Sequence, residues 1–175
     1  MRGSRPPPRR KGGCVSCQRV LATALESGDS IQSTHHLHLD PLPKVVGSAR
    51  AFVREHAPPL PEETTEVLVL LTSELVTNAV LHARSAIELG ITVADHSVVV
   101  TVHDEDLTRS EQQPYEGREG GWGLALVREL SAASSLEVHP GDGKTAWFRL
   151  PRSGGPAGRA GGAARPQVGF RTATA

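Results

Sequence analysis

Three polar side chains recur at every fourth residue of one helical segment. Glu74, Asn78 and His82 stand at positions i, i+4 and i+8, so at ~100° per residue they form a single stripe. Four apolar residues share this sector of the helix and predict that it is buried: Val67, Leu70, Leu71 and Leu81. A buried carboxylate is retained where it is paired, neutralised or bound to a ligand or metal ion. The stripe is therefore a candidate site, unless Glu74 faces a solvent gap or pairs with Arg84 or His82.

An acidic triplet follows the second of two predicted strands. Asp104, Glu105 and Asp106 come directly after residues 97–103, where side chains project from the edge of a sheet. A carboxylate in that place can accept a hydrogen bond from an exocyclic amine. Taken alone, the triplet indicates a solvated acidic turn.

A glycine-rich turn opens a short predicted helix. Gly120, Gly121 and Gly123 surround Trp122 just before residues 124–130. Glycines let the backbone approach a phosphate closely, and the free N–H groups at a helix start favour an anion. Such turns are common before helices, and this one is neither a Walker loop nor a dinucleotide fingerprint.

The elements that must position these residues follow from the apolar periodicity. Residues 41–56 and a segment that opens at Pro61 and runs to about Ala83 predict two helices. Two hairpins are predicted, one from residues 87–94 and 97–103 and one from residues 134–139 and 144–150. With the helix 124–130 between the hairpins, this order predicts an α+β fold. We expect a two-layer α/β sandwich whose mixed, mostly antiparallel sheet carries helices on one face.

The chain divides into three parts by composition. Residues 1–33 predict a flexible basic extension, and residues 34–151 predict the folded domain. Residues 152–175 are rich in Gly, Ala and Arg, so we expect a disordered tail.

Charge and hydropathy exclude several kinds of partner. Ten of the nineteen basic residues lie at the two ends, which leaves residues 20–151 with a formal charge of −10. Nucleic acid is therefore an unlikely partner for the domain, since phosphate binding depends on basic patches. Apolar runs are shorter than the ~20 residues of a membrane span, so we expect a cytoplasmic protein without a membrane segment.

Two cysteines and three histidines near the start of the chain raise the question of zinc. Cys14 and Cys17 precede His35, His36 and His38, but seventeen residues separate the two groups, which is a poor spacing for a zinc site. The favoured alternative is that residues 34–39 form the first edge strand, with its leucines inward and its histidines outward.

Taken together, the three polar elements resemble a known family. They are similar to the nucleotide-binding (GHKL or Bergerat) fold of histidine kinases and gyrase, and above all to the single-domain anti-sigma-factor serine/threonine kinases of bacterial partner-switching systems. Residues 72–83 resemble the N box of that branch at nearly every position, whereas residues 120–127 and 143–148 resemble its second glycine box and its final strand. The resemblance spans roughly residues 34–151.

The resemblance implies a role for each matching residue. Asn78 is implied to hold Mg²⁺ on the phosphates of ATP, and Asp104 to accept a hydrogen bond from the adenine amine. Glu74 is implied to orient or deprotonate the attacking hydroxyl, and Thr145 to lie near the adenine. The backbone is implied to cradle the phosphates at three positions, which are Gly121, Gly123 and Leu124. One departure stands out, because Asp106 replaces a glycine of the wider superfamily and predicts weaker ATP binding.

Two functions remain open from the sequence. The resemblance implies an anti-sigma factor that uses Mg-ATP to phosphorylate a Ser or Thr of a small antagonist protein, with a sigma factor as its other partner and a homodimer as a possible assembly. The alternative is a non-catalytic module in which ATP sets the shape of a protein-binding surface. Glu74 favours the kinase, because a carboxylate beside a metal ligand has little use in a binding module.

Overall fold

The fold is built on one antiparallel sheet. The structure, a computed structural model, describes residues 15–25, 28–82, 85–105 and 122–153. Its five strands follow the order β1-β2-β3-β5-β4, and every neighbouring pair is antiparallel. The strands are β1 (Ile31–Leu39), β2 (Ile87–Ala94), β3 (Ser97–Asp104), β4 (Ala133–His139) and β5 (Gly143–Pro151).

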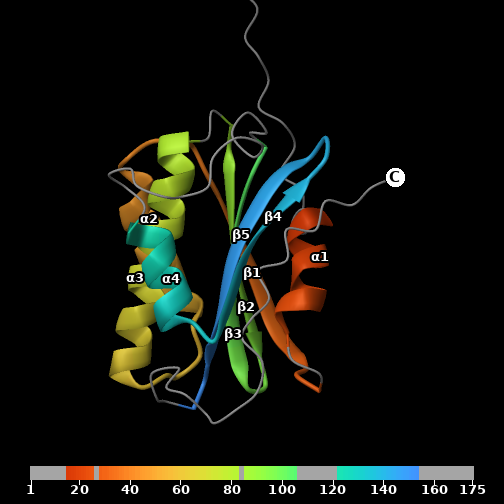
Figure 1. Cartoon of the computed structure of the whole chain (residues 1–175). Helices are drawn as coiled ribbons and strands as arrows, with labels where there is room; N and C mark the ends of the chain where they lie inside the picture. The colour runs from red at the N-terminus through yellow and green to blue at the C-terminus, as the bar shows by residue number, and fades with distance from the viewer. Residues whose placement is uncertain (1–14, 26–27, 83–84, 106–121, 154–175) are drawn as a thin grey trace, which may run out of the picture.

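Helices cover both faces of this sheet. Figure 1 shows three of them on one face, namely α2 (Val45–His56), α3 (Glu62–His82) and α4 (Trp122–Leu130). The fourth helix, α1 (Val15–Ala24), lies on the opposite face. The predicted α+β fold with a mostly antiparallel sheet is confirmed, but helices cover both faces of the sheet and not the one face expected, because α1 packs on the second face. The two predicted hairpins form β2–β3 and β4–β5.

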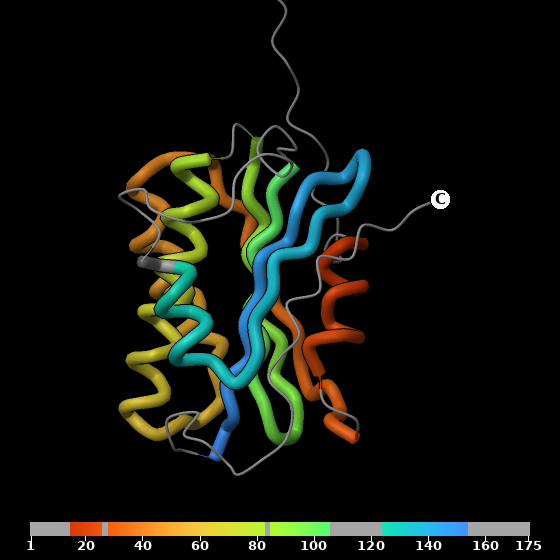
Figure 2. Tube along the Cα trace, viewed as in Figure 1, coloured from red at the N-terminus to blue at the C-terminus, as the bar shows by residue number. Residues whose placement is uncertain are grey.

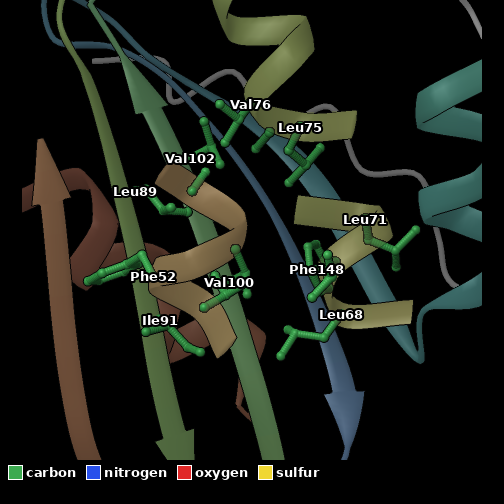
Figure 3. Close-up of a cluster of buried hydrophobic side chains, with 14 of the residues drawn as sticks. Phe52, Leu68, Leu71, Leu75, Val76, Leu89, Ile91, Val100, Val102 and Phe148 are labelled. Carbon is green, nitrogen blue, oxygen red and sulfur yellow. The ribbon is translucent and has the colours of Figure 1, made fainter. Parts of the chain in front are cut away.

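The main core lies between the sheet and the face that carries three helices. Alternate residues of a strand point to opposite faces, so Val98, Val100 and Val102 of β3 all join this core. Figure 3 shows Val76 of α3 beside Val102, and Phe148 of β5 near Leu68. Burial of aliphatic side chains at about 25 cal/mol per Å² of apolar area is therefore the main force that fixes α3 against the sheet.

One side of α3 differs from the prediction. Leu70 and Leu81 were expected in the buried sector, but they are 40% and 70% exposed. The buried residues instead follow the line of Leu68, Leu71 and Leu75. The physical reason is that α3 has only a weak amphipathic pattern, with apolar residues almost all around it, so periodicity alone does not select the packed side.

Helix α1 differs from the flexible extension that was expected over residues 1–33, within the part of that range that the structure describes. It packs on the second face of the sheet through Val20 and Ala24, which contact Val99 of β3 and Trp147 of β5. The prediction failed because a helix of ten residues is too short for its apolar residues to show a sustained helical period. Its docking depends on apolar residues that β3 and β5 present far away in the sequence. The strand β1 also begins at Ile31, before the predicted residue 34.

Helix α3 also bears on the question of a membrane. By length and hydropathy it could cross a bilayer, with a mean hydropathy of 1.3 over its best window. The buried residues of α3 pack into the main core against the sheet. The central helix of a globular domain can be as long and as apolar as a membrane span, so these two properties are weak evidence for a membrane segment.

Candidate functional site

Several of the polar residues singled out in the sequence lie on elements that meet at one end of the sheet. Figure 2 shows that α3 ends, β3 ends and β5 begins at the same end of the molecule. The antiparallel register places Asp104, the last residue of β3, opposite Lys144 near the start of β5. Helix α3 therefore brings Asn78 and His82 of its last turns toward the end at which Asp104 lies.

Glu74 and Asn78 lie at the border of the packed side of α3. Both are half-buried, whereas Leu75 and Ala79, the residues that follow each of them, belong to the core. Among the described residues the structure gives neither side chain a hydrogen bond or an ion pair. Because both side chains are only half-buried, part of each is open to a ligand at this border of α3.

Asp104 is engaged by a lysine that the sequence analysis did not single out. The Lys144 Nζ atom donates to the Asp104 Oδ1 atom at 2.7 Å. Both residues are buried, with 3% and 8% of their surface exposed. Asp104 shares a face of the sheet with Val102, and Lys144 shares it with Ala146, so the pair faces the same side as α3.

Thr145 lies on the other face of the sheet. Its hydroxyl group is 3.0 Å from Nδ1 of His103 and 3.1 Å from Nε2 of His139. The structure therefore places Thr145 and Asp104 on opposite faces of the sheet, and it is Lys144 that lies beside Asp104. The alternation of β5 carries a signal for this, because Ala146 and Phe148 are apolar and inward, which puts the even-numbered Lys144 on their side.

The start of α4 holds part of the expected phosphate loop. Trp122 begins this helix, so Gly123 lies in its first turn, and the half-buried Leu124 packs against the main core. Exposed backbone N–H groups are typical of a first helical turn and suit a phosphate. Gly121 and Asp106 lie outside the described residues.

The histidines of β1 do not gather into a zinc site. His35 stacks on His56 of α2, with ring centroids 4.2 Å apart, whereas His36 and His38 approach Glu88 at 3.4 and 3.6 Å. Within the part of the chain that the structure describes, no group of three His, Cys, Asp or Glu residues could hold a metal ion. Cys17 is buried in α1, and Cys14 lies outside the described residues. The edge-strand interpretation of β1 is confirmed, except that His35 faces the same side as Leu37.

The donor set at the end of α3 is compatible with magnesium and a nucleotide. Mg²⁺ prefers oxygen ligands and retains several waters, so one amide oxygen such as that of Asn78 is enough when phosphate oxygens supply the rest. The half-buried position of Asn78 leaves this amide within reach of a ligand.

Comparison with known proteins also points to a nucleotide as the ligand of this domain. A model of the histidine kinase-like ATPase domain matches residues 39–150. This chain belongs to that family. Membership in a family of ATPase domains indicates that ATP is the ligand. No curated protein matches the chain.

Two solved structures resemble this histidine kinase-like ATPase domain. The crystal structure of the RsbU and RsbW domains of Rv1364c from Mycobacterium tuberculosis has 24% identity and a TM-score of 0.53, over 68% of this chain and 32% of that one. The histidine kinase domain of the Erythrobacter litoralis EL346 blue-light activated histidine kinase has 25% identity and a TM-score of 0.42, over 62% and 58%. The chain thus spans about a third of the first protein and under two thirds of the second, and the first likeness supports the fold.

Proposed function

We propose that this chain binds Mg-ATP and phosphorylates a Ser or Thr of a small antagonist protein, and that it otherwise binds a sigma factor. The observation that carries the proposal is the position of Glu74 and Asn78. Both are half-buried on the last turns of α3, at the end of the sheet where the buried Asp104 closes β3. The family assignment supports ATP as the ligand of this end.

Each residue has a defined task in this proposal. The amide oxygen of Asn78 would hold Mg²⁺, which neutralises the charge of the phosphates when bound. The Asp104 carboxylate would accept a hydrogen bond from the exocyclic amine of adenine. Backbone groups at the start of α4, which are those of Gly121, Gly123 and Leu124, would hold the phosphates.

Glu74 would act on the attacking hydroxyl group. The bond between the γ-phosphorus and its bridging oxygen breaks, and a new bond forms to the Ser or Thr oxygen of the antagonist. The hydroxyl proton passes to the Glu74 carboxylate, and ADP leaves with the bridging oxygen. Such transfer depends mainly on positioning and on charge stabilisation, so a single carboxylate is sufficient as the base.

The choice of partner rests on two supports. Residues 72–83 resemble the N box of anti-sigma-factor kinases. The fold also resembles a structure that contains an RsbW domain.

A homodimer and a cytoplasmic location belong to the same proposal. The acidic character of residues 20–151 argues against nucleic acid as the partner of the domain.

A second candidate function is favoured by the ion pair at Asp104. Because Lys144 already binds the carboxylate at 2.7 Å, adenine must share it or displace the lysine. A site of this kind can bind ATP weakly and serve as a protein-binding module whose shape responds to nucleotide, without phosphoryl transfer.

Calorimetry with Mg-ATP tests the proposal directly. We expect saturable binding to the wild-type chain and its loss in Asn78→Ala. Thr77→Ala is the matched control, because Thr77 is the exposed neighbour of Asn78 on the same helix. Radiolabelled ATP with candidate antagonist proteins from the same genome then separates the two functions: label on the antagonist supports the kinase, and binding without transfer supports the module. If the wild type does not bind Mg-ATP, both are wrong.

A further inference from the structure

The buried ion pair of Asp104 and Lys144 contains both a hydrogen-bond acceptor and a hydrogen-bond donor. A carboxylate accepts hydrogen bonds and an ammonium group donates them, so the pair presents an acceptor and a donor side by side. The Lys144 Nζ atom and the Asp104 Oδ1 atom are 2.7 Å apart, so one base edge can meet both groups. The pair faces the α3 side of the sheet, on which the nucleotide site is proposed.

The backbone fixes where this pair stands. Asp104 and Lys144 are directly opposite each other in the β3–β5 ladder. The turn before Lys144 is held as well, since Ser16 of α1 donates a hydrogen bond to Asp142. Both residues therefore belong to paired strands, and the β3–β5 ladder fixes the positions of their backbones.

Adenine and guanine differ at the atom that such a pair meets. Adenine carries an amine donor at position 6, whereas guanine carries a carbonyl acceptor there. A carboxylate alone favours adenine and repels the guanine oxygen. An adjacent ammonium group supplies the donor that the guanine oxygen requires, so the pair can satisfy either purine.

We infer that Lys144 is a specificity-determining residue, whose ammonium group beside Asp104 lets this site accept guanine as well as adenine nucleotides. The inference rests on the proposed function, because it assumes that the base lies at Asp104. It predicts that the wild-type chain binds Mg-ATP and Mg-GTP with dissociation constants within about tenfold of each other.

The test compares Mg-ATP and Mg-GTP by calorimetry on the wild type and on Lys144→Met. Methionine keeps the length of the side chain and removes the donor. We expect the preference for ATP over GTP to rise by about tenfold to a hundredfold, which is the effect of losing one hydrogen bond to a charged group. Lys144→Arg keeps a charged donor at this position, so this variant should bind GTP more tightly than Lys144→Met does. Lys44→Met is the matched control, because Lys44 is exposed before α2, and it should leave both affinities unchanged.

Several outcomes would overturn the inference. An unchanged ratio in Lys144→Met would make Lys144 a structural partner of Asp104 only. A wild-type preference for ATP above about tenfold would also contradict it, and this measurement needs no variant to fold. In both cases Mg-ATP still binds and the proposed function stands, whereas a wild type that binds neither nucleotide refutes the proposed function and the inference together.

Discussion

A Cβ atom on Gly143 would lie 2.0 Å from the carbonyl oxygen of Asp104 and 2.6 Å from the Cα atom of Glu105. The backbone of Gly143 also has a φ of +99°, which L side chains rarely adopt. Two independent constraints therefore require glycine at the start of β5. The close packing of Gly143 brings the start of β5 against Asp104, the residue that is proposed to bind the adenine base.

From this contact we predict that Gly143→Ala lowers the free energy of unfolding by about 3 kcal/mol, the sum of backbone strain and a steric clash. Gly141→Ala is the control, because Gly141 has a φ of +79° but no atom within 4 Å of its Cβ position. Strain alone should cost Gly141→Ala about 1 kcal/mol. Urea denaturation of both variants measures the difference. Equal losses would show that the clash with Asp104 is relieved at no cost.

Much of the candidate site could be proposed from the sequence because its residues follow a regular pattern. Glu74 and Asn78 were found from helical spacing, and Asp104 from its place at the end of a β-branched run. The position of Lys144 was missed, since neighbouring residues of a strand face opposite sides and the resemblance pointed to Thr145. Which of the two residues faces the α3 side of the sheet depends on the pairing of β3 with β5, in which Asp104 and Lys144 are partners 40 residues apart in the sequence.

Other features could not be predicted because they depend on tertiary contacts. Helix α1 has no strong pattern of its own, and its docking requires Val99 and Trp147 on the second face of the sheet. The exposed side of α3 was also misjudged, as Leu81 shows. Where a helix is apolar almost all around, the shape of the sheet decides which side is buried.

The docking of α1 can be tested with two substitutions of the same kind. Val20 is fully buried against the sheet, whereas Val15 on the same helix is 56% exposed. We predict that Val20→Asp destabilises the protein by about 3 kcal/mol or detaches α1, because it buries an unpaired charge. Val15→Asp should change stability by less than about 0.5 kcal/mol. Hydrogen exchange of the α1 amides is the readout, and protection that survives Val20→Asp would contradict the observed packing.

The histidines on the second face of the sheet predict a pH dependence. Burial lowers the pKa of His139 below its ordinary 6.5; Glu137 and Asp142 act to raise it, and His103 and Arg19 to lower it. In the window below pH 6.5 the unfolded chain therefore binds more protons at this position than the folded chain does. The stability that neutral His139 contributes is complete above pH 6.5 and is lost as the pH falls through the folded-state pKa.

The hydrogen bonds of Thr145 explain how this loss acts on the structure. Its one hydroxyl proton can be donated to only one of the rings of His103 and His139, so the other ring must donate. When the His139 ring is protonated, it can no longer accept. We expect thermal melts of the wild type to show a falling midpoint from pH 7.5 to 5, and a smaller fall in His139→Gln. His96→Gln, at an exposed turn, is the control. An identical pH profile in His139→Gln would exclude this residue as the cause.

The proposed base can be separated from the proposed nucleotide site by one substitution. Glu74→Gln keeps the size of the side chain but cannot accept the hydroxyl proton. We predict that phosphoryl transfer to the antagonist falls by about 10²- to 10⁴-fold, the usual contribution of a general base. Affinity for Mg-ATP should stay within about threefold of the wild type, because the loss concerns only the transition state. Glu66→Gln, at an exposed position two turns earlier on α3, should leave both quantities unchanged. Full transfer by Glu74→Gln would remove Glu74 from the reaction, and loss of ATP binding would assign it to the nucleotide instead.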